Sequence, residues 1–264
     1  MKDINNKTVW ITGASDGIGK ELAIQLAKKG AKIVLTARNT AKLEALKLSL
    51  AGDGHLVYPM DLLKTDLIPT AAAAVLKNMG TIDILINNAG ISQRSLAQNT
   101  TLEVDRKIME LDYFAVISLT KALLPHFLER KQGHIVTISS VAGKIGPPMR
   151  SAYAAAKHAV IGFMDSLRAE THKENIKVLI VTPGSIRTNI SKNALEGDGA
   201  THGVTDPAIA NGLPVDYCAK RIIKAIEREE AEVLIAAGKE KMVTYLKRLS
   251  PNLVYKILRS IKTT

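Results

Sequence analysis

The sequence predicts an α/β fold in which helices flank a doubly wound parallel sheet of about seven strands, within a single domain that ends in a C-terminal helical extension. Short runs of Ile, Val and Leu alternate strictly with longer helical patterns. The runs are almost continuously apolar, which is typical of strands that helices cover on both faces. The 264 residues, 46% of them apolar, suffice for one large domain with a substantial core.

The elements follow in order along the chain. The predicted strands span 8–12, 32–37, 55–60, 82–88, 133–139, 176–182 and 232–236. The predicted helices span 18–29, 40–50, 66–79, 101–129 with Pro125 near its end, 151–172 and 214–229. Residues 184–213 form one long loop rich in Gly, Asn, Thr and Asp, and a loop of this length in a compact domain is usually functional, such as a lid. We therefore assign 1–238 to the main domain, with a lid at 184–213, and 239–264 to a tail.

Composition excludes several classes of protein. The single cysteine, Cys218, excludes an internal disulfide and fits a reducing compartment. The N-terminus lacks the pattern of a secretory signal, and no segment has 18 unbroken apolar residues, so we expect a cytoplasmic protein without a spanning helix. The net charge is +11, but residues 239–264 alone supply +6, which argues against a nucleic-acid groove in the body. His55, His134 and His158 have no clustered partners, so no metal site is expected.

A glycine-rich turn, TGASDGIG at 12–19, joins the first predicted strand to the first predicted helix. In this context such a turn holds a dinucleotide diphosphate, in the manner of a Rossmann-type fold. Gly13 would form the tight turn, Gly17 would let the backbone approach phosphate, and Gly19 would let the helix pack closely on the sheet. The helix N-terminus at 17–20 would offer free N–H groups to the anion.

Four further motifs follow the turn in order, and together the five resemble the short-chain dehydrogenase/reductase family, in its short single-domain branch. They are NNAG (87–90), ISS (138–140), YAAAK (153–157) and PGSIRT (183–188). The resemblance covers about 8–236. Within the family, GHIVTISSVAGK and SAYAAAKHAVIGFMDSLRAE look most like the dehydrogenase/reductase member 7B-like group.

The second strand predicts which dinucleotide binds. It ends without the acidic residue that selects NAD, and Arg38 suits the 2′-phosphate of NADP, so NADP(H) is favoured over NAD(H). Asp16 argues against this choice if its carboxylate points inward. The alternative interpretation of Arg38 is a solvated arginine that follows a strand and binds no phosphate.

The resemblance also implies a set of cofactor-binding residues. By this resemblance Asp61 binds the adenine amino group; the alternative is that it is only a turn aspartate. Thr188 and the Ile186 backbone hold the nicotinamide carboxamide. Asn87 has a structural role and ties neighbouring strands together. The full set is Gly13, Ser15, Asp16, Gly17, Ile18, Gly19, Arg38, Asp61, Leu62, Asn88, Ala89, Gly90, Tyr153, Lys157, Pro183, Gly184, Ile186 and Thr188.

The chemistry is expected from three side chains. Hydride transfer to a carbonyl leaves an alkoxide that must gain a proton. A tyrosine can act as the acid/base at neutral pH only if a nearby cation lowers the pKa of its hydroxyl. Tyr153 and Lys157 are four residues apart on a predicted helix and therefore share a face. By resemblance, Tyr153 is the acid/base, Lys157 lowers its pKa and binds the nicotinamide ribose, and Ser140 hydrogen-bonds the substrate oxygen. Ser139 is the alternative serine.

One position departs from the family pattern. MELDYFA places Asp112 where relatives carry an Asn that anchors a water molecule leading to the catalytic lysine. The Asp112 charge would pair with Lys157, weaken its effect on Tyr153 and shift the pH optimum. The alternative is that Asp112 is a tolerated replacement.

Two functions remain open at this stage. The first is an NADP-dependent oxidoreductase acting on a fairly hydrophobic carbonyl or secondary alcohol, as a homodimer or homotetramer paired through 101–129 and 151–172. The alternative is a dinucleotide-binding regulatory or scaffold protein with weak or no catalysis, suggested by Asp112 and the tail.

The tail at 239–264 alternates basic residues with Met, Val, Leu, Ile and Tyr and is broken at Pro251, which predicts two short amphipathic helices. They would cover the active site, dock on a second subunit, pack as a solvated extension, or lie on an anionic membrane surface.

Overall fold

The protein forms one seven-stranded sheet within residues 3–260, which are the residues that the computed structural model describes. The strand order is β3-β2-β1-β4-β5-β6-β7, and every neighbouring pair is parallel, so the predicted doubly wound sheet is confirmed. The strands are β1 (Thr8–Thr12), β2 (Lys32–Thr36), β3 (Leu56–Val57), β4 (Ile84–Asn87), β5 (Gly133–Ile138), β6 (Ile176–Pro183) and β7 (Glu232–Ile235).

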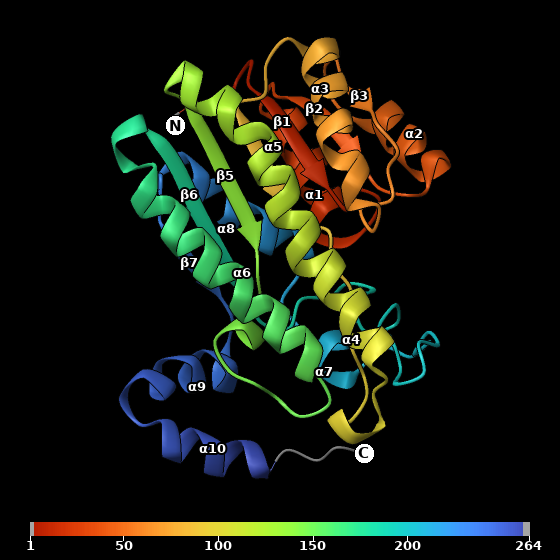
Figure 1. Ribbon diagram of the computed structural model, residues 1–264, viewed down its shortest axis with the longest axis vertical. Coiled ribbons are helices and arrows are strands. Elements are labelled where there is room, and N and C mark those ends of the chain that lie inside the picture. Colours follow the sequence, from red (N-terminus) through yellow and green to blue (C-terminus); the bar gives the residue numbers. More distant parts are fainter. Residues whose placement is uncertain (1–2, 261–264) are drawn as a thin grey trace.

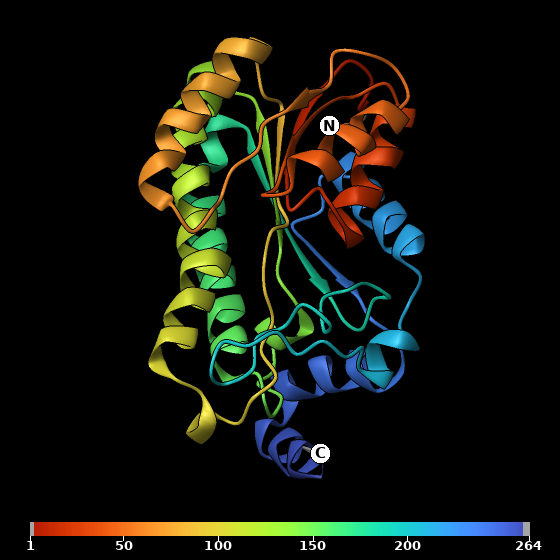
Figure 2. The ribbon, with the colours of Figure 1, turned by 90° about the vertical axis from the view of Figure 1, so that its right-hand side faces the viewer.

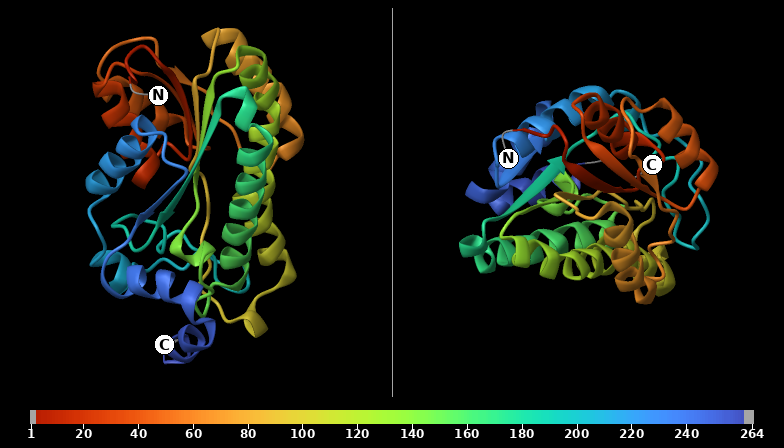
Figure 3. Two further views of the ribbon diagram at one scale, coloured as in Figure 1. Left: turned by 90° about the vertical axis from the view of Figure 1, so that its left-hand side faces the viewer. Right: turned by 90° about the horizontal axis from the view of Figure 1, so that it is seen from above.

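Helices cover both faces of the sheet (Figures 1 and 2). One face carries α1 (Gly17–Lys28), α2 (Thr40–Ser49) and α8 (Val215–Glu227). The other carries α3 (Ile68–Met79), α5 (Ala115–Arg130) and α6 (Ser151–Glu170). Single-turn 3₁₀ segments lie at Thr65–Leu67, Ala97–Asn99, Val141–Gly143 and His172–Glu174. The view from above in Figure 3 shows the sheet between the two helical layers.

The core consists of two apolar layers, one on each face of the sheet. All residues of β1, β4 and β5 are buried, as expected for strands that are apolar on both sides. Leu26 and Ile222 are buried in one layer, and Phe127 and Met164 are buried in the other. Each such side chain contributes about 1.5–3 kcal/mol on burial, so the sheet is a rigid support for the loops at its ends.

The longest helical segment runs from Leu102 to Arg130. It consists of α4 (Leu102–Met109), a π-helical turn η3 (Glu110–Phe114) and α5. Within residues 3–260 it is the one helix that is long and apolar enough to cross a membrane. Its most apolar stretch of 18 residues has a mean hydropathy of 1.2, and 39% of that stretch is buried. Leu119, Leu123 and Phe127 are nevertheless buried against the sheet, so here the segment is a core helix, and its outer face carries both apolar and charged side chains.

Strand β3 is shorter than the prediction of 55–60. Only Leu56 and Val57 form regular ladder pairs with β2. The N–H groups of Tyr58 and Met60 still donate to Leu35 and Ala37 carbonyls, but Pro59 between them has no N–H to donate. The sheet edge therefore ends as an irregular segment that leads toward Asp61.

The C-terminal tail contains two helices, α9 (Gly238–Leu249) and α10 (Pro251–Arg259). They lie at the carboxyl end of the sheet, below the strand arrows in Figure 1 and beside the loop after β6 in Figure 3. Val243, Val254 and Leu258 pack on Val141 and Ile145 of the main domain. The last part of the predicted tail, 261–264, lies outside the described residues.

His134, in β5, is a buried imidazole at the opposite end of the sheet. Its side chain has no exposed surface, and neither ring nitrogen has a hydrogen-bond partner within residues 3–260. Burial lowers the pKa of His134 to about 3 because a charged ring would lose its hydration. The folded protein therefore holds His134 neutral at pH values where the unfolded chain protonates it.

Acid is expected to destabilise the protein through this histidine. An unfolded His titrates near pH 6.5, so between pH 6.5 and about 3 the unfolded state binds the extra proton and stability falls as pH falls. Between pH 7.5 and 5 this group alone removes about 2 kcal/mol. Urea unfolding at both pH values should show that loss, and His134→Val should lack it. The exposed His172→Gln variant should behave as wild type; an equal loss in His134→Val would contradict the assignment.

Candidate active site

A cleft opens at the carboxyl ends of β1, β4, β5 and β6, where parallel α/β sheets bind ligands. A cavity of about 930 Å³ lies there, lined by the predicted glycine turn, the segment after β4, the helix α6 and the loop after β6. A cavity of this size accommodates a large cofactor together with part of a substrate.

Thr12 and Asn88 organise the glycine turn. The Asn88 side chain donates to the carbonyls of Thr12 (3.0 Å) and Gly13 (3.1 Å), while Thr12 Oγ1 accepts the N–H groups of Asn88 and Ala89. Asn88 therefore ties the ends of β1 and β4 together. The prediction that Asn87 ties neighbouring strands together is wrong for its side chain, which donates to Thr120 of helix α5 at 3.1 Å.

The three glycines meet the geometry expected of them in different ways. Gly13 has φ +64°, a conformation that L side chains rarely adopt, and makes the turn out of β1. A Cβ at Gly19 would overlap the Gly13 carbonyl and the Asn88 side chain, so Gly19 allows α1 to pack closely. Gly19 does not line the cavity, whereas Gly13, Gly17, Ser15 and Ile18 do.

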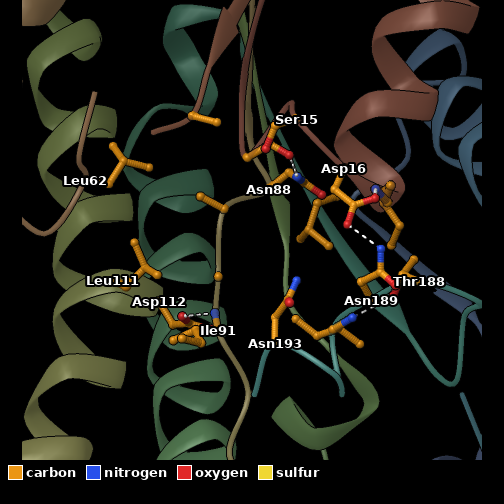
Figure 4. A pocket seen from close by; sticks show the side chains of 18 of the residues that line it. Ser15, Asp16, Leu62, Asn88, Ile91, Leu111, Asp112, Thr188, Asn189 and Asn193 are labelled. Atoms are coloured by element: carbon orange, nitrogen blue, oxygen red, sulfur yellow. Dashed lines mark hydrogen bonds between the residues drawn. The ribbon is translucent and has the colours of Figure 1, made fainter. Parts of the chain in front are cut away.

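Asp16 caps helix α1 and links the glycine turn to the loop after β6. Its Oδ1 accepts the Gly17 N–H at 2.8 Å, and its Oδ2 accepts Asn189 Nδ2 at 2.8 Å (Figure 4). The expectation that N–H groups at 17–20 are free is therefore wrong in part, because the Gly17 N–H is paired with Asp16 and the Lys20 N–H donates to the Asp16 carbonyl.

Cations lie where the cavity meets the end of β2 and the start of α2. Arg38, the predicted phosphate-binding residue, follows β2 and lines the cavity. Asn39 and Lys42 at the start of α2 also line it. Lys42 was not identified from the sequence, although its position four residues after Arg38 was a usable signal. Asp61 also lines the cavity, and its Oδ1 accepts the Leu63 N–H at 3.1 Å, which makes it a turn residue as well.

Ser140 is the freer of the two neighbouring serines after β5. The Ser139 hydroxyl is buried and donates to the Lys157 carbonyl at 3.0 Å. Ser140 caps the following 3₁₀ turn by accepting the Ala142 N–H at 3.1 Å, and it is partly exposed to the cavity. Its hydroxyl has a contact of 3.5 Å to the Pro183 carbonyl, so the proton can be redirected toward a ligand.

Tyr153 and Lys157 lie one turn apart on α6 and both line the cavity. The Lys157 Nζ lies 5.7 Å from the centroid of the Tyr153 ring and donates to the Ile138 carbonyl at 3.0 Å. Lys157 is buried, whereas Tyr153 is partly exposed to the cavity. The phenol and its cation are therefore brought together with Ser140 at one end of the cleft.

Asp112 forms a buried ion pair with this lysine. Its Oδ2 lies 3.2 Å from Lys157 Nζ, and its Oδ1 accepts the Ile91 N–H at 2.8 Å (Figure 4). The residue sits in the π-helical turn η3, and such turns are frequent at functional sites. The pairing expected from the sequence is therefore present in the structure.

Burial and charge act in opposite directions on this pair. Burial raises the pKa of Asp112, and the nearby Lys157 ammonium opposes that rise without cancelling it. Burial would lower the pKa of Lys157, but the charges of Asp112 and Tyr153 outweigh it and leave that pKa raised. Lys157 is therefore held as an ammonium ion at neutral pH.

The loop after β6 closes the other side of the cleft. The cavity lining includes Pro183, Gly184, Ile186 and Thr188, which are the residues of this loop predicted to bind the cofactor. The Thr188 methyl group packs close to Gly17, where a Cβ would lie 3.1 Å from it. The loop therefore passes directly over the glycine turn.

The predicted lid, 184–213, is ordered by anchors at several points and contains the short helix α7 (Pro207–Ala210). Leu195 exchanges backbone hydrogen bonds with Ser92 and Arg94. The buried Arg94 pairs with Asp206 at 2.5 Å, and Arg150 lies 3.3 Å from the same carboxylate. Burial would raise the pKa of Asp206, but the Arg94 hydrogen bond and charge outweigh it and lower that pKa.

The structure places nearly all the predicted site residues around one cavity. Ser140, Tyr153, Lys157 and Asp112 line it, and so does every predicted cofactor residue except Gly19. The lining residues that sequence reasoning did not identify include Asn39, Lys42, Ile91, Lys107, Leu111, Asn189, Ile190, Asn193, Leu195, Gly199, Thr201 and Ile209. No cluster of three His, Cys, Asp or Glu side chains suited to a metal occurs within residues 3–260.

Comparison with known proteins identifies the family. The family model described as short chain dehydrogenase matches residues 7–199. The mouse protein named dehydrogenase/reductase SDR family member 7B is 44% identical over 263 residues, which cover 97% of this chain and 81% of the mouse protein. The predicted resemblance to the 7B-like group is thereby confirmed.

Solved structures show the same fold with nicotinamide dinucleotides. A short-chain dehydrogenase/reductase from Burkholderia phymatum in complex with NAD has a TM-score of 0.85 at 21% identity over 96% of both chains, and supports the fold alone. A short-chain dehydrogenase from Sphingobium yanoikuyae in complex with NADPH has a TM-score of 0.78 at 28% identity, over 97% of this chain and 96% of that one. This chain belongs to the short-chain dehydrogenase/reductase family of NAD(P)-dependent oxidoreductases.

Proposed function

We propose that the protein is an NADP-dependent oxidoreductase that interconverts a carbonyl compound and a secondary alcohol, with Tyr153 as the acid/base. The observation that carries the proposal is the convergence of Tyr153, Lys157 and Ser140 on one cavity that also contains the glycine turn. Neither the phenol nor the Ser140 hydroxyl is fully buried, so both can contact a substrate.

The residues around the cavity fit a nicotinamide dinucleotide. The glycine turn leaves backbone room for a diphosphate. By the family resemblance, Asn88–Gly90 border the adenosine ribose, Lys157 binds the nicotinamide ribose, and Ile186 and Thr188 hold the carboxamide. The bound cofactor supplies or accepts a hydride at its nicotinamide ring.

The chain itself handles the proton. In the reductive direction the Tyr153 hydroxyl donates its proton to the carbonyl oxygen as that carbon gains a hydride, which yields the alcohol. The Lys157 ammonium, 5.7 Å from the ring centroid, stabilises the resulting phenolate. The Ser140 hydroxyl donates a hydrogen bond to the same substrate oxygen and stabilises its developing charge. The oxidative direction reverses each step.

Arg38 supports NADP over NAD. It stands at the end of β2 without an acidic neighbour, and Lys42 adds a second cation on the same side of the cavity. The objection from Asp16 weakens, because both of its carboxylate oxygens are engaged, one by Gly17 and one by Asn189. The adenosine end of the cleft therefore suits an added phosphate.

Arg38→Ala is expected to raise the KM for NADPH about 30-fold and to leave the KM for NADH within a factor of two, because an arginine–phosphate contact is worth roughly 2 kcal/mol. Steady-state kinetics with both cofactors measure the effect. Arg106→Ala, an exposed arginine on α4, serves as the matched control. Equal changes for NADPH and NADH would contradict a 2′-phosphate contact.

Apolar side chains contribute to the cavity wall beyond the glycine turn. Ile91, Leu111, Ile190 and Leu195 line it together with polar groups of the lid. We propose a fairly hydrophobic substrate that presents one carbonyl or secondary alcohol to Tyr153. NADPH oxidation with a panel of ketones of increasing apolar size tests the proposal. Tight cofactor binding with no turnover on any of them would favour the alternative, a dinucleotide-binding regulatory or scaffold protein.

We propose that α5 and α6 pair with a second copy of the chain to form a homodimer, or a homotetramer. One outer stripe of the long helix carries Phe114, Ile117, Leu124 and Leu128, which are exposed or half-buried, together with the exposed Lys121. An apolar stripe of this kind is typical of helices that meet a partner. Sedimentation equilibrium should give a dimer or tetramer mass, and a monomer at micromolar concentration would contradict it.

We propose peripheral contact between the tail and an anionic membrane, which would modify a cytoplasmic location. Met242, Tyr245, Leu249 and Leu253 are exposed on α9 and α10, among seven Lys and Arg residues in 239–264. Flotation with phosphatidylserine vesicles should recover the wild type, and Leu249→Asp should reduce the recovery. Equal flotation of both proteins would remove the proposal.

A further inference from the structure

Helix α9 contacts the loop that follows β6 through one acidic side chain. Glu240 Oε2 accepts the Ser185 N–H at 2.9 Å, and Glu240 Oε1 accepts the Ser185 hydroxyl at 2.6 Å. Glu240 is the single acidic residue in the sequence 239–264. The one carboxylate of a strongly basic tail is therefore directed inward, onto the backbone of the loop that lines the cavity.

The loop is built to receive this carboxylate. A Cβ at Gly184 would overlap Glu240 Oε2, so the glycine leaves the space that the carboxylate occupies. The Gly184 N–H donates to the Ile235 carbonyl at 3.0 Å, which fixes the start of the loop to β7. Ser185 lies between Gly184 and Ile186, both of which line the cavity, so its position sets theirs.

The same helix borders the turn that carries Ser140. Val243 packs in one cluster with Val141, which directly follows that serine, and with Ile145. Further along α9, Lys247 Nζ donates to the Lys144 carbonyl at 2.8 Å. Helix α9 therefore touches both loops at the nicotinamide end of the cleft, although its own side chains do not line the cavity.

We infer that Glu240 is a positioning residue for the nicotinamide half of the cofactor. The inference rests on the proposed function, because it assumes that the loop 183–188 holds the carboxamide. A carboxylate that accepts two hydrogen bonds from one residue holds that residue more firmly than neutral partners would. Without Glu240, Ser185 keeps its backbone contact with Leu213 but loses both hydrogen bonds to helix α9, so the loop is held less firmly and the carboxamide partners are less well preformed. The adenosine half of the cleft is unchanged.

The test compares two ligands in binding titrations. Glu240→Ala is expected to weaken NADPH binding about tenfold and to leave the binding of 2′,5′-ADP, which lacks the nicotinamide half, within a factor of two. Glu240→Gln, which keeps one acceptor, should fall between wild type and Glu240→Ala. Lys241→Ala, on the exposed side of the same helix, is the matched control and should bind both ligands as wild type does.

A double-variant cycle assigns the effect to Ser185. Ser185→Ala keeps the backbone N–H but loses the hydroxyl, so Glu240→Ala with Ser185→Ala should weaken NADPH binding no more than Glu240→Ala alone. The steady-state KM for NADPH should rise with the dissociation constant, and kcat should change less.

The outcomes separate the inference from the proposed function. Three results would overturn the inference and leave the proposed function intact. The first is a folded Glu240→Ala that binds NADPH as wild type does, and the second is an equal loss of affinity for NADPH and 2′,5′-ADP. The third is a double variant whose loss of NADPH affinity equals the product of the two single losses. If Glu240→Ala does not fold, the binding of NADPH and of 2′,5′-ADP is compared in Glu240→Gln and Ser185→Ala instead. A wild-type protein that binds neither NADPH nor NADH would overturn both proposals.

Discussion

Tyr153→Phe should lower kcat about 1,000-fold while NADPH binds within a factor of two of wild type. The substitution removes one hydroxyl and keeps the ring, so the α6 backbone and the contact of 5.7 Å with Lys157 can persist. General acid–base catalysis by a positioned side chain contributes roughly 100- to 10,000-fold. The loss therefore falls on the chemical step and spares the binding step.

Single-turnover kinetics under saturating NADPH measure this loss directly, because they separate hydride transfer from product release. Tyr217→Phe, an exposed tyrosine on α8, is the matched control and should retain wild-type turnover. Retention of more than about a tenth of the activity by Tyr153→Phe would show that another group supplies the proton.

Asp112→Asn should move the pH–rate profile toward lower pH by about one unit. The amide keeps an acceptor for the Ile91 N–H but removes the charge that lies 3.2 Å from Lys157 Nζ. Asp112 is the largest influence that raises the pKa of Lys157, so its loss lets burial lower that pKa. The alkaline limb, where Lys157 loses its proton, therefore shifts down. At lower pH the unpaired ammonium stabilises the phenolate more strongly, which moves the acidic limb in the same direction.

The pH dependence of kcat in both reaction directions measures the shift, with the exposed Glu103→Gln on α4 as control. An unchanged profile would refute the coupling and leave Asp112 as a tolerated replacement. Asp112→Ala leaves the buried Lys157 ammonium without its ion-pair partner, and it should lower the free energy of unfolding by about 3 kcal/mol. Urea unfolding near neutral pH would show that cost as a lower midpoint.

The sequence predicts the parts of this site that depend on local pattern. The glycine turn is recognised because it follows a strand and opens a helix. Tyr153 and Lys157 share a helical face, and they are identified together with Ser140 through the resemblance to the family. Arg38 is recognised because it follows the second strand, and Ser140 because it lies after the fifth strand at the distance from Tyr153 that the family resemblance implies. For all four residues, position in the alternating strand and helix order fixes position in the cleft.

Contacts between segments that are far apart in the chain could not be predicted from the sequence. Asp16 and Asn189 are 173 residues apart, and Ser185 and Glu240 are 55 apart, so no periodicity connects them. The role of Asn87 was assigned to the wrong partner because the direction of its side chain depends on how the end of β4 is oriented. The interior of the lid is set by such pairings, which explains why its lining residues emerge only with the structure.

The lid is held at both ends. Near one end Asn189 is bound to Asp16, and near the other Asp206 is bound to Arg94. The intervening stretch supplies Asn193, Gly199 and Thr201 to the cavity wall. Between these two points the backbone of Leu195 is also bound to Ser92 and Arg94, so variation that changes the substrate is expected at the side chains that face the cavity, while the backbone path of the loop and the glycine turn stay as they are.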